Sequence, residues 1–156
     1  MKHWNIVILC ATILFTGCDE ESNYGLSSVP SAPVQYTVYV TRENPGFVID
    51  HGFQVLSPIT TKRYEYDYIG YAGLLIWVGM DNAYHAADLC CPNCINRSKP
   101  IESDGGLFVT CPVCKEQYDI SYGLSVPTKG IAREALKQYT VIERNSVTGL
   151  ELQITN

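Results

Sequence analysis

Two stretches, Cys91-Pro92-Asn93-Cys94 and Cys111-Pro112-Val113-Cys114, repeat one short motif with sixteen residues between them. Two residues between a pair of cysteines allow a tight turn that aims both sulfur atoms at one point, and N–H groups inside the turn can hydrogen-bond the thiolates. Two such turns that face each other form a tetrahedral site with four sulfur ligands. The pattern therefore predicts a metal site made by Cys91, Cys94, Cys111 and Cys114, with a hairpin between the two turns.

The spacing leaves the occupant of this site open, because zinc, a single iron ion and an iron-sulfur cluster are all held by thiolates. Four cysteines also close a coordination sphere, whereas a catalytic metal usually keeps one position free for water or substrate. The chain has no Gly-x-Ser-x-Gly, phosphate-loop or His-Glu-x-x-His motif. Both observations predict a protein that is not an enzyme.

Cys90 and His85 lie close to this motif but are not expected to be ligands. Cys90 directly precedes Cys91, and neighbouring side chains of an extended segment point to opposite faces. We therefore expect Cys90 to be a small buried residue. His85 belongs to a strand-like run, where a lone histidine is more often structural than a ligand.

The chain after residue 33 has the pattern of an all-β domain. Short runs rich in β-branched and aromatic residues are separated by Gly, Pro, Asn or Asp, which is typical of antiparallel sheets in a sandwich or barrel. The predicted strands cover residues 34–40, 53–56, 64–68, 74–78, 107–110, 138–142 and 150–154. Residues 131–138 have helical composition, but a loop entering a strand fits them equally well.

The first eighteen residues have the features of an export signal. Lys2 and His3 precede the apolar run Ile6 to Phe15, which is shorter than the roughly 20 residues that a helix needs to span a bilayer. The sequence Leu14-Phe15-Thr16-Gly17-Cys18 resembles the lipobox of bacterial lipoproteins, in which the signal is cut before a cysteine that then carries diacylglycerol. We expect residues 1–17 to be a lipoprotein signal peptide and Cys18 to be the lipidated residue. The protein would then be anchored in a membrane of the cell envelope, at the periplasmic face or the cell surface.

The remaining chain is predicted to be one domain on a short tether. Residues 18–33 contain acidic residues, serine, glycine and two prolines without an apolar period, as in a flexible lipidated linker. Residues 34–156 are enough for a single domain with a core. A net charge of −5 without a run of basic residues argues against nucleic acid as a partner. Export makes two disulfide bonds the main alternative to a metal, with free thiols as a third possibility.

A longer pattern around the cysteines resembles the Rieske iron-sulfur domain. In that family, a Gly-rich strand and a short segment with an aromatic residue, Ala and Asp precede the first ligand loop. This chain has a Gly-rich strand at 70–78, and before Cys91-Pro92 it has the run Tyr84-His85-Ala86-Ala87-Asp88-Leu89. The run from Cys111 to Ile120, with Gly123 after it, resembles the family's second loop. The family's tail is matched by Pro127, Gly130, Ala132, Leu136 and Tyr139. The departures concern the ligands, since Asn93 and Cys114 stand at the two histidine positions and Cys94 follows Asn93.

The resemblance implies a Rieske-like domain over 34–156, with a rubredoxin- or zinc-ribbon-like subdomain at about 84–127 that binds a [2Fe-2S] cluster. By position, Cys91 and Cys111 would hold one iron, and Cys94 and Cys114 the other. A branch of small bacterial lipoproteins shares this replacement of histidine by cysteine. The implied function is an electron carrier that passes single electrons to a redox partner protein, and the alternative is a structural zinc site, or a disulfide-stapled domain, in a lipoprotein that acts as a binding module. All-thiolate ligation would place a [2Fe-2S] potential below the Rieske range of about −150 to +300 mV.

The lipobox resemblance generates a first prediction, on Cys18. In Cys18→Ser the acceptor of the lipid is missing, so the protein should stay uncleaved or unlipidated and leave the detergent-soluble membrane lipoprotein fraction. Partitioning of variant and wild type between aqueous and detergent phases measures this. Unchanged partitioning of the variant would remove the lipid anchor from the interpretation.

Overall fold

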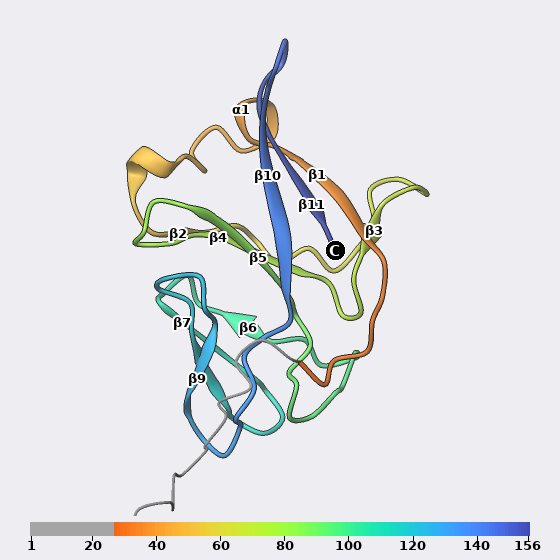
Figure 1. Ribbon diagram of the computed structural model, residues 1–156, viewed down its shortest axis with the longest axis vertical. Helices are drawn as coiled ribbons and strands as arrows, with labels where there is room; N and C mark the ends of the chain where they lie inside the picture. Colours follow the sequence, from red (N-terminus) through yellow and green to blue (C-terminus); the bar gives the residue numbers. More distant parts are fainter. Residues whose placement is uncertain (1–26) are drawn as a thin grey trace, which may run out of the picture.

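The computed structural model describes residues 27–156, which form two antiparallel sheets (Figure 1). The larger sheet curls into a half-barrel with the strand order β2-β4-β5-β10-β11-β1-β3. Its strands are β1 (Val34–Tyr39), β2 (Gln54–Val55), β3 (Tyr68–Ile69), β4 (Leu74–Val78), β5 (Tyr84–Asp88), β10 (Gln138–Ser146) and β11 (Gly149–Thr155). The predicted all-β fold class is therefore confirmed.

The smaller sheet lies at one end of the molecule, at the lower left of Figure 1, and has the order β6-β7-β8-β9. Its strands are β6 (Glu102–Ser103), β7 (Phe108–Thr110), β8 (Gln117–Asp119) and β9 (Val126–Lys129). Helix among the described residues is limited to α1 (Val40–Glu43) and the 3₁₀ turn η1 (Ile49–His51). The second cysteine pair occupies the turn between β7 and β8, so the small sheet is built around it.

Most predicted strands are confirmed, and one is largely wrong. The prediction for 74–78 coincides with β4, and residues 131–137 form the loop that enters β10, not a helix. Of the predicted strand 64–68, only Tyr68 is in a strand. The reason is the buried carboxylate of Asp67, which accepts hydrogen bonds from the N–H groups of Arg63 and Tyr64 and so folds this segment back on itself.

Strand β4 is buried on both faces, which explains why its sequence Leu-Leu-Ile-Trp-Val is apolar at every position. Leu74, Ile76 and Val78 pack inside the half-barrel. Leu75 and Trp77 point the other way, into a second cluster that also contains the buried cysteines of the small-sheet end. The metal-site end therefore shares a hydrophobic core with the large sheet.

The packed chain begins before the predicted domain start at residue 34. Val29 is only 2% exposed and belongs to the core cluster beneath the small sheet. Ser28 donates through its N–H and its hydroxyl to the carboxylate of Glu134, and the Lys137 ammonium donates to the Val29 carbonyl. The predicted linker 18–33 thus overlaps the folded part of the chain by several residues.

The predicted signal peptide at 1–17 and the lipidated Cys18 lie outside the described residues. Within residues 27–156, no helix is long and apolar enough to cross a membrane.

Asp88 ties the large sheet to the start of the first cysteine turn. It is fully buried at the end of β5, and its carboxylate accepts four hydrogen bonds. The donors are the N–H groups of Tyr71 (2.6 Å), Ala72 (3.1 Å) and Cys90 (2.8 Å) and the hydroxyl of Tyr139 (2.7 Å). Burial and this carboxylate raise the pKa of Tyr139, so its hydroxyl keeps the proton that it donates.

Removal of this carboxylate should be among the most damaging single changes outside the metal site. Asp88→Ala leaves two buried N–H groups, the partly buried N–H of Tyr71 and one buried hydroxyl without their acceptor, and we expect a loss of about 3 kcal/mol or more in the free energy of unfolding. Urea unfolding measures it. The matched control is Glu143→Ala on the exposed part of β10, where the change should stay within about 0.5 kcal/mol. Equal effects of the two variants would contradict the role assigned to Asp88.

Candidate metal centre

The two cysteine turns have the same backbone design. In the first, the carbonyl of Cys91 accepts the N–H of Ile95 at 2.9 Å, and in the second, the carbonyl of Cys111 accepts the N–H of Lys115 at 3.0 Å. Ile95 and Lys115 both have positive φ, 47° and 64°, in the left-handed backbone region that residues other than glycine seldom adopt. Each turn thus closes one residue after its second cysteine, which points both of its sulfurs toward the opposite turn.

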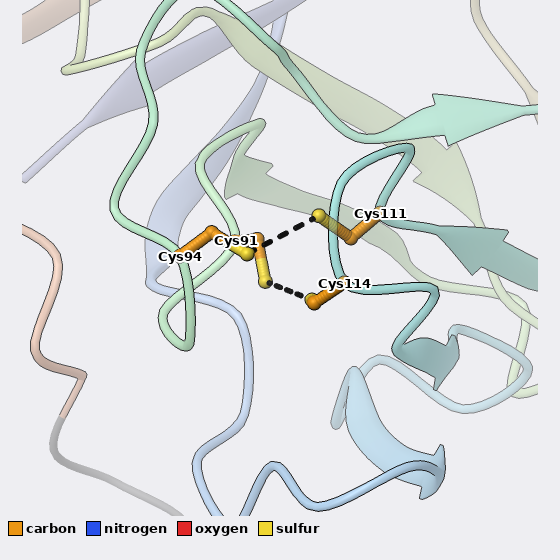
Figure 2. Close-up of side chains that lie close together, drawn as sticks. All are labelled: Cys91, Cys94, Cys111 and Cys114. Atoms are coloured by element: carbon orange, nitrogen blue, oxygen red, sulfur yellow. Dashed lines mark hydrogen bonds between the residues drawn. The ribbon is translucent and has the colours of Figure 1, made fainter.

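The four predicted ligands come together, and their Sγ atoms all lie within 4.8 Å of one another (Figure 2). Sγ of Cys91 is 3.6 Å from that of Cys114, and Sγ of Cys111 is 3.9 Å from that of Cys94. The contacts run between the turns, so neither turn is complete without the other. Four close cysteine sulfurs form a group that can hold a metal ion.

The site has an inner and an outer half. Cys91 and Cys111 are buried, at 1% and 0% exposure, and are part of the core cluster under β4. Cys94 and Cys114 are partly exposed at the edge of the same group. A bound metal would therefore have two buried ligands on its core side and two partly exposed ligands on its solvent side.

Hydrogen-bond donors surround the sulfurs unevenly. Burial raises the pKa of Cys91 to about 11, although the Tyr118 hydroxyl and the N–H groups of Cys94 and Asn93 act in the opposite direction. Burial also acts to raise the pKa of Cys114, but donors that include the Glu116 N–H outweigh it and lower that pKa to about 7. The four thiols cannot all ionise at neutral pH on their own, so a metal must displace protons as it binds.

Tyr118 contacts the sulfur group in a way that the sequence did not indicate. It is fully buried on β8, and its hydroxyl oxygen lies 3.3 Å from Sγ of Cys91. Burial and the neighbouring sulfur raise the pKa of Tyr118, so its hydroxyl stays protonated and can donate to a Cys91 thiolate. Hydrogen bonds to ligand sulfurs stabilise their negative charge and tune the metal that they hold. A single tyrosine in a strand carries no sequence signal for this contact.

Glu116 is the second residue that the sequence did not indicate. It follows the second turn and is 1% exposed. Its Oε1 accepts the N–H of Ile131 at 2.6 Å, while Oε2 has no hydrogen-bond partner within the described structure. Gly130 has φ +111°, and a Cβ there would meet the Glu116 carboxylate. Glu116 therefore holds the 130–131 segment close to the four cysteines. Its burial could not be expected from the sequence, because an acidic residue next to a turn is usually exposed.

Cys90 and His85 stay outside the metal-binding group of the described residues, as expected. Cys90 is fully buried, and its N–H is fixed by Asp88. Burial and the Asp88 charge raise the pKa of its thiol to about 12. His85 bonds Asp81 at 3.0 Å, and its ring packs at a tilt against Trp77. The contacts of Cys90 and His85 are therefore those of residues that support the fold.

All five cysteines between residues 27 and 156 are free thiols. Sγ of Cys91 and Cys114 are 3.6 Å apart and Sγ of Cys94 and Cys111 are 3.9 Å apart, well beyond the roughly 2.05 Å of a disulfide bond. The cross-turn arrangement also brings all four sulfurs to one place, where two disulfides would need only pairs. These positions favour a metal over the disulfide alternative.

Comparison of the chain with family models, with curated proteins and with solved structures gave no match. The Rieske resemblance therefore stays a prediction from the sequence.

The geometry separates four ligand cysteines from Cys90. Cys91→Ser, Cys94→Ser, Cys111→Ser and Cys114→Ser should each lose most of the bound metal and lower the thermal midpoint, because each removes one of four thiolates from a shared ion. Cys90→Ser should keep the wild-type metal content, since its sulfur is not in the group. Metal content per chain, measured on purified variants, tests this. A loss at Cys90 equal to that at the other four would show that the wrong member of the vicinal pair has been assigned.

Proposed function

We propose that this protein is a one-electron carrier whose redox centre is iron held by Cys91, Cys94, Cys111 and Cys114. Iron bound by four thiolates exchanges one electron between its +2 and +3 states. The observation that supports the proposal most strongly is the compact group of four sulfurs, of which two reach the surface. Four thiolates fill a tetrahedron and leave no position for substrate, so the proposal is a carrier and not an enzyme.

The sulfur separations favour one ion over the [2Fe-2S] cluster that the Rieske resemblance implies. A tetrahedral ion with metal–sulfur bonds of about 2.3 Å has its sulfurs about 3.8 Å apart. The separations of 3.6 and 3.9 Å, with all others below 4.8 Å, are close to this value. In a [2Fe-2S] cluster the thiolates form two pairs on two separate irons, and the resemblance puts the two cysteines of each turn on different irons, so the two sulfurs of each turn would have to move apart to accept it.

The hydrogen-bond donors and the burial around the four sulfurs suit an electron-transfer centre. The Tyr118 hydroxyl and N–H groups in both turns donate to thiolates, which stabilises the more negative, reduced state. The buried half of the site is fixed by the core, so little rearrangement is needed when the charge changes. The exposed half, at Cys94 and Cys114, brings the centre within reach of another protein.

Structural zinc is the second candidate, because it takes the same four-sulfur tetrahedron. The observation that favours it is the burial of Cys91 and Cys111 in the core cluster, which would make the ion a staple between the small sheet and β4. Zinc does no redox chemistry, so a zinc-loaded protein would be a structural or binding module.

The location completes the proposal. A lipid on Cys18 would hold the carrier at a membrane of the cell envelope, where it would meet a redox partner protein. This part rests on the resemblance of residues 14–18 to a lipobox, and on the sequence alone.

Metal and sulfide content of anaerobically purified protein tests the proposal. We expect one iron per chain, no acid-labile sulfide, and a reversible one-electron couple in voltammetry. The midpoint potential should vary little with pH near neutrality, because the site has no imidazole ligand to lose a proton. Two irons and two sulfides per chain would replace the single ion by a [2Fe-2S] cluster, whereas one zinc without a couple would overturn the carrier. The Cys90→Ser variant serves as the matched control and should reproduce the wild-type values.

A further inference from the structure

The curled sheet leaves an opening between its two edges. One edge is the segment that continues from β2, in which backbone hydrogen bonds join Leu56 and Ile59 to β4. The other edge is β1, because β3 pairs with it only at Val34 and Gln35. A groove of about 220 Å³ lies between these edges and is lined by residues from both. It is referred to below as the edge groove.

The edge groove has an apolar lining and a few polar groups. The apolar lining comes from Tyr36, Val38, Leu56 and Ile59. These residues belong to the cluster inside the half-barrel, not to the cluster that contains the cysteines. Asn44 and Ser57 also line the groove, and within the described residues their side-chain amide and hydroxyl form no hydrogen bond. Apolar walls with a few unused polar groups are typical of sites for small ligands.

Arg63 joins the edge groove to an aromatic surface. Its guanidinium lies over three rings, at 4.4 Å from the ring centre of Tyr36, 5.6 Å from that of Tyr39 and 5.7 Å from that of Tyr64. It also donates to the carboxylate of Glu43 at 2.6 Å. Because Arg63 and Tyr36 both line the groove, the three rings lie next to it.

Two tyrosines extend this aromatic surface into solvent. The rings of Tyr64 and Tyr66 stack with their centres 5.2 Å apart and their planes 13° apart, and the two residues are 47% and 65% exposed. The buried Asp67 carboxylate holds the turn that carries them, and in Figure 1 this turn projects from the molecule beside β3. A ligand that covers the stacked rings would therefore not have to order the turn first.

The charges around the edge groove cancel. Segments 36–44 and 56–68 contain three cations, Arg42, Lys62 and Arg63, and three acidic residues, Glu43, Glu65 and Asp67. Arg63 forms ion pairs with both Glu43 and Asp67. A surface without a charge excess is not suited to nucleic acid or to anionic lipid headgroups, which proteins bind through clustered cations. The lining therefore fits an uncharged ligand.

We propose that the edge groove and the Tyr64–Tyr66 stack bind a neutral oligosaccharide. A sugar ring carries hydroxyls around its edge and carbon-bound hydrogens on its faces, and these weakly positive hydrogens match the negative face of an aromatic ring. One sugar would enter the groove, with its hydroxyls on Ser57 and Asn44. The next sugars along the chain would cover Tyr64 and Tyr66. The proposal does not depend on the metal or on electron transfer.

A proline-rich peptide is the competing occupant, because such peptides also dock in grooves lined by aromatic residues. Its backbone offers carbonyl acceptors but no N–H at proline. The Ser57 hydroxyl and the Asn44 amide can both donate and accept, so a peptide of this kind would leave their acceptor atoms unpaired. Sugar hydroxyls also donate and accept, and can pair with each of these groups. The polar lining therefore favours a sugar.

Isothermal titration calorimetry of the full chain with neutral hexasaccharides tests the proposal. The probes differ in linkage and stereochemistry and are cellohexaose, maltohexaose, mannohexaose and chitohexaose. We expect saturable binding of at least one of them, and weaker binding of the anionic hexagalacturonate. Absence of binding by all four neutral probes, or tighter binding of hexagalacturonate, would overturn the proposal. Binding of decaproline without binding of a neutral probe would assign the groove to a peptide and overturn it as well.

Variants of exposed tyrosines locate the binding. Tyr66→Ala removes the more exposed ring and should weaken the affinity for the bound hexasaccharide by about fivefold to tenfold. Tyr66→Phe keeps the ring and should stay within about twofold of wild type. The matched control is Tyr122→Ala, a change of a tyrosine that is 61% exposed between β8 and β9, and it should alter the affinity by less than about twofold.

Asn44→Ala tests the groove itself. It removes one of the unused polar groups and should weaken the same hexasaccharide by about fivefold. The thermal midpoint of each variant shows that the fold is kept. Wild-type affinity in both Tyr66→Ala and Asn44→Ala, or an equal loss in Tyr122→Ala, would place any sugar binding elsewhere and overturn the proposal.

Discussion

The constraint on which this structure depends is the meeting of four sulfur atoms in a space that cannot hold four negative charges alone. Burial raises the pKa of Cys91 and of Cys94, whereas hydrogen-bond donors outweigh burial at Cys114 and lower its pKa. A cation resolves the conflict, because it replaces the protons and attracts all four thiolates at once. The proposed metal would couple the folding of the small sheet to the filling of the site, because the turn between β7 and β8 contributes half of the ligands.

The surroundings of the site transmit this constraint to the rest of the molecule. Cys91 and Cys111 pack with Leu75 and Trp77 of β4, so the sulfur group and the large sheet share buried surface. Asp88 fixes the backbone just before the first turn through its bonds to both sheet and loop. Displacement of either turn would disturb apolar packing and satisfied polar groups together, which is why the site is expected to be rigid.

Features of the fold and the site that arise from neighbouring residues in the sequence could be predicted, whereas features that arise from contacts across the fold could not. The four ligands and β4 could be predicted, because a repeated Cys-Pro-x-Cys and a continuous apolar run are local signals. The error at 64–68 came from Asp67, whose side chain captured backbone N–H groups that a strand would have used. The roles of Tyr118 and Glu116 depend on contacts across the fold, with Cys91 and Ile131, and no spacing along one chain encodes them.

The contact between Ser28 and Glu134 also determines which end of the domain an upstream tether would hold. It fastens the N-terminal end of the described chain to the loop that carries Ile131, so any tether upstream pulls on the metal end of the domain. If Cys18 carries the lipid, the nine residues from Cys18 to Leu26 span at most roughly 30 Å when fully extended. The four-cysteine group would then stay within a thin layer above the bilayer, where encounters with membrane-bound proteins are a two-dimensional diffusion problem. The length of the tether, and not affinity alone, would set the rate at which the domain encounters a membrane-bound protein.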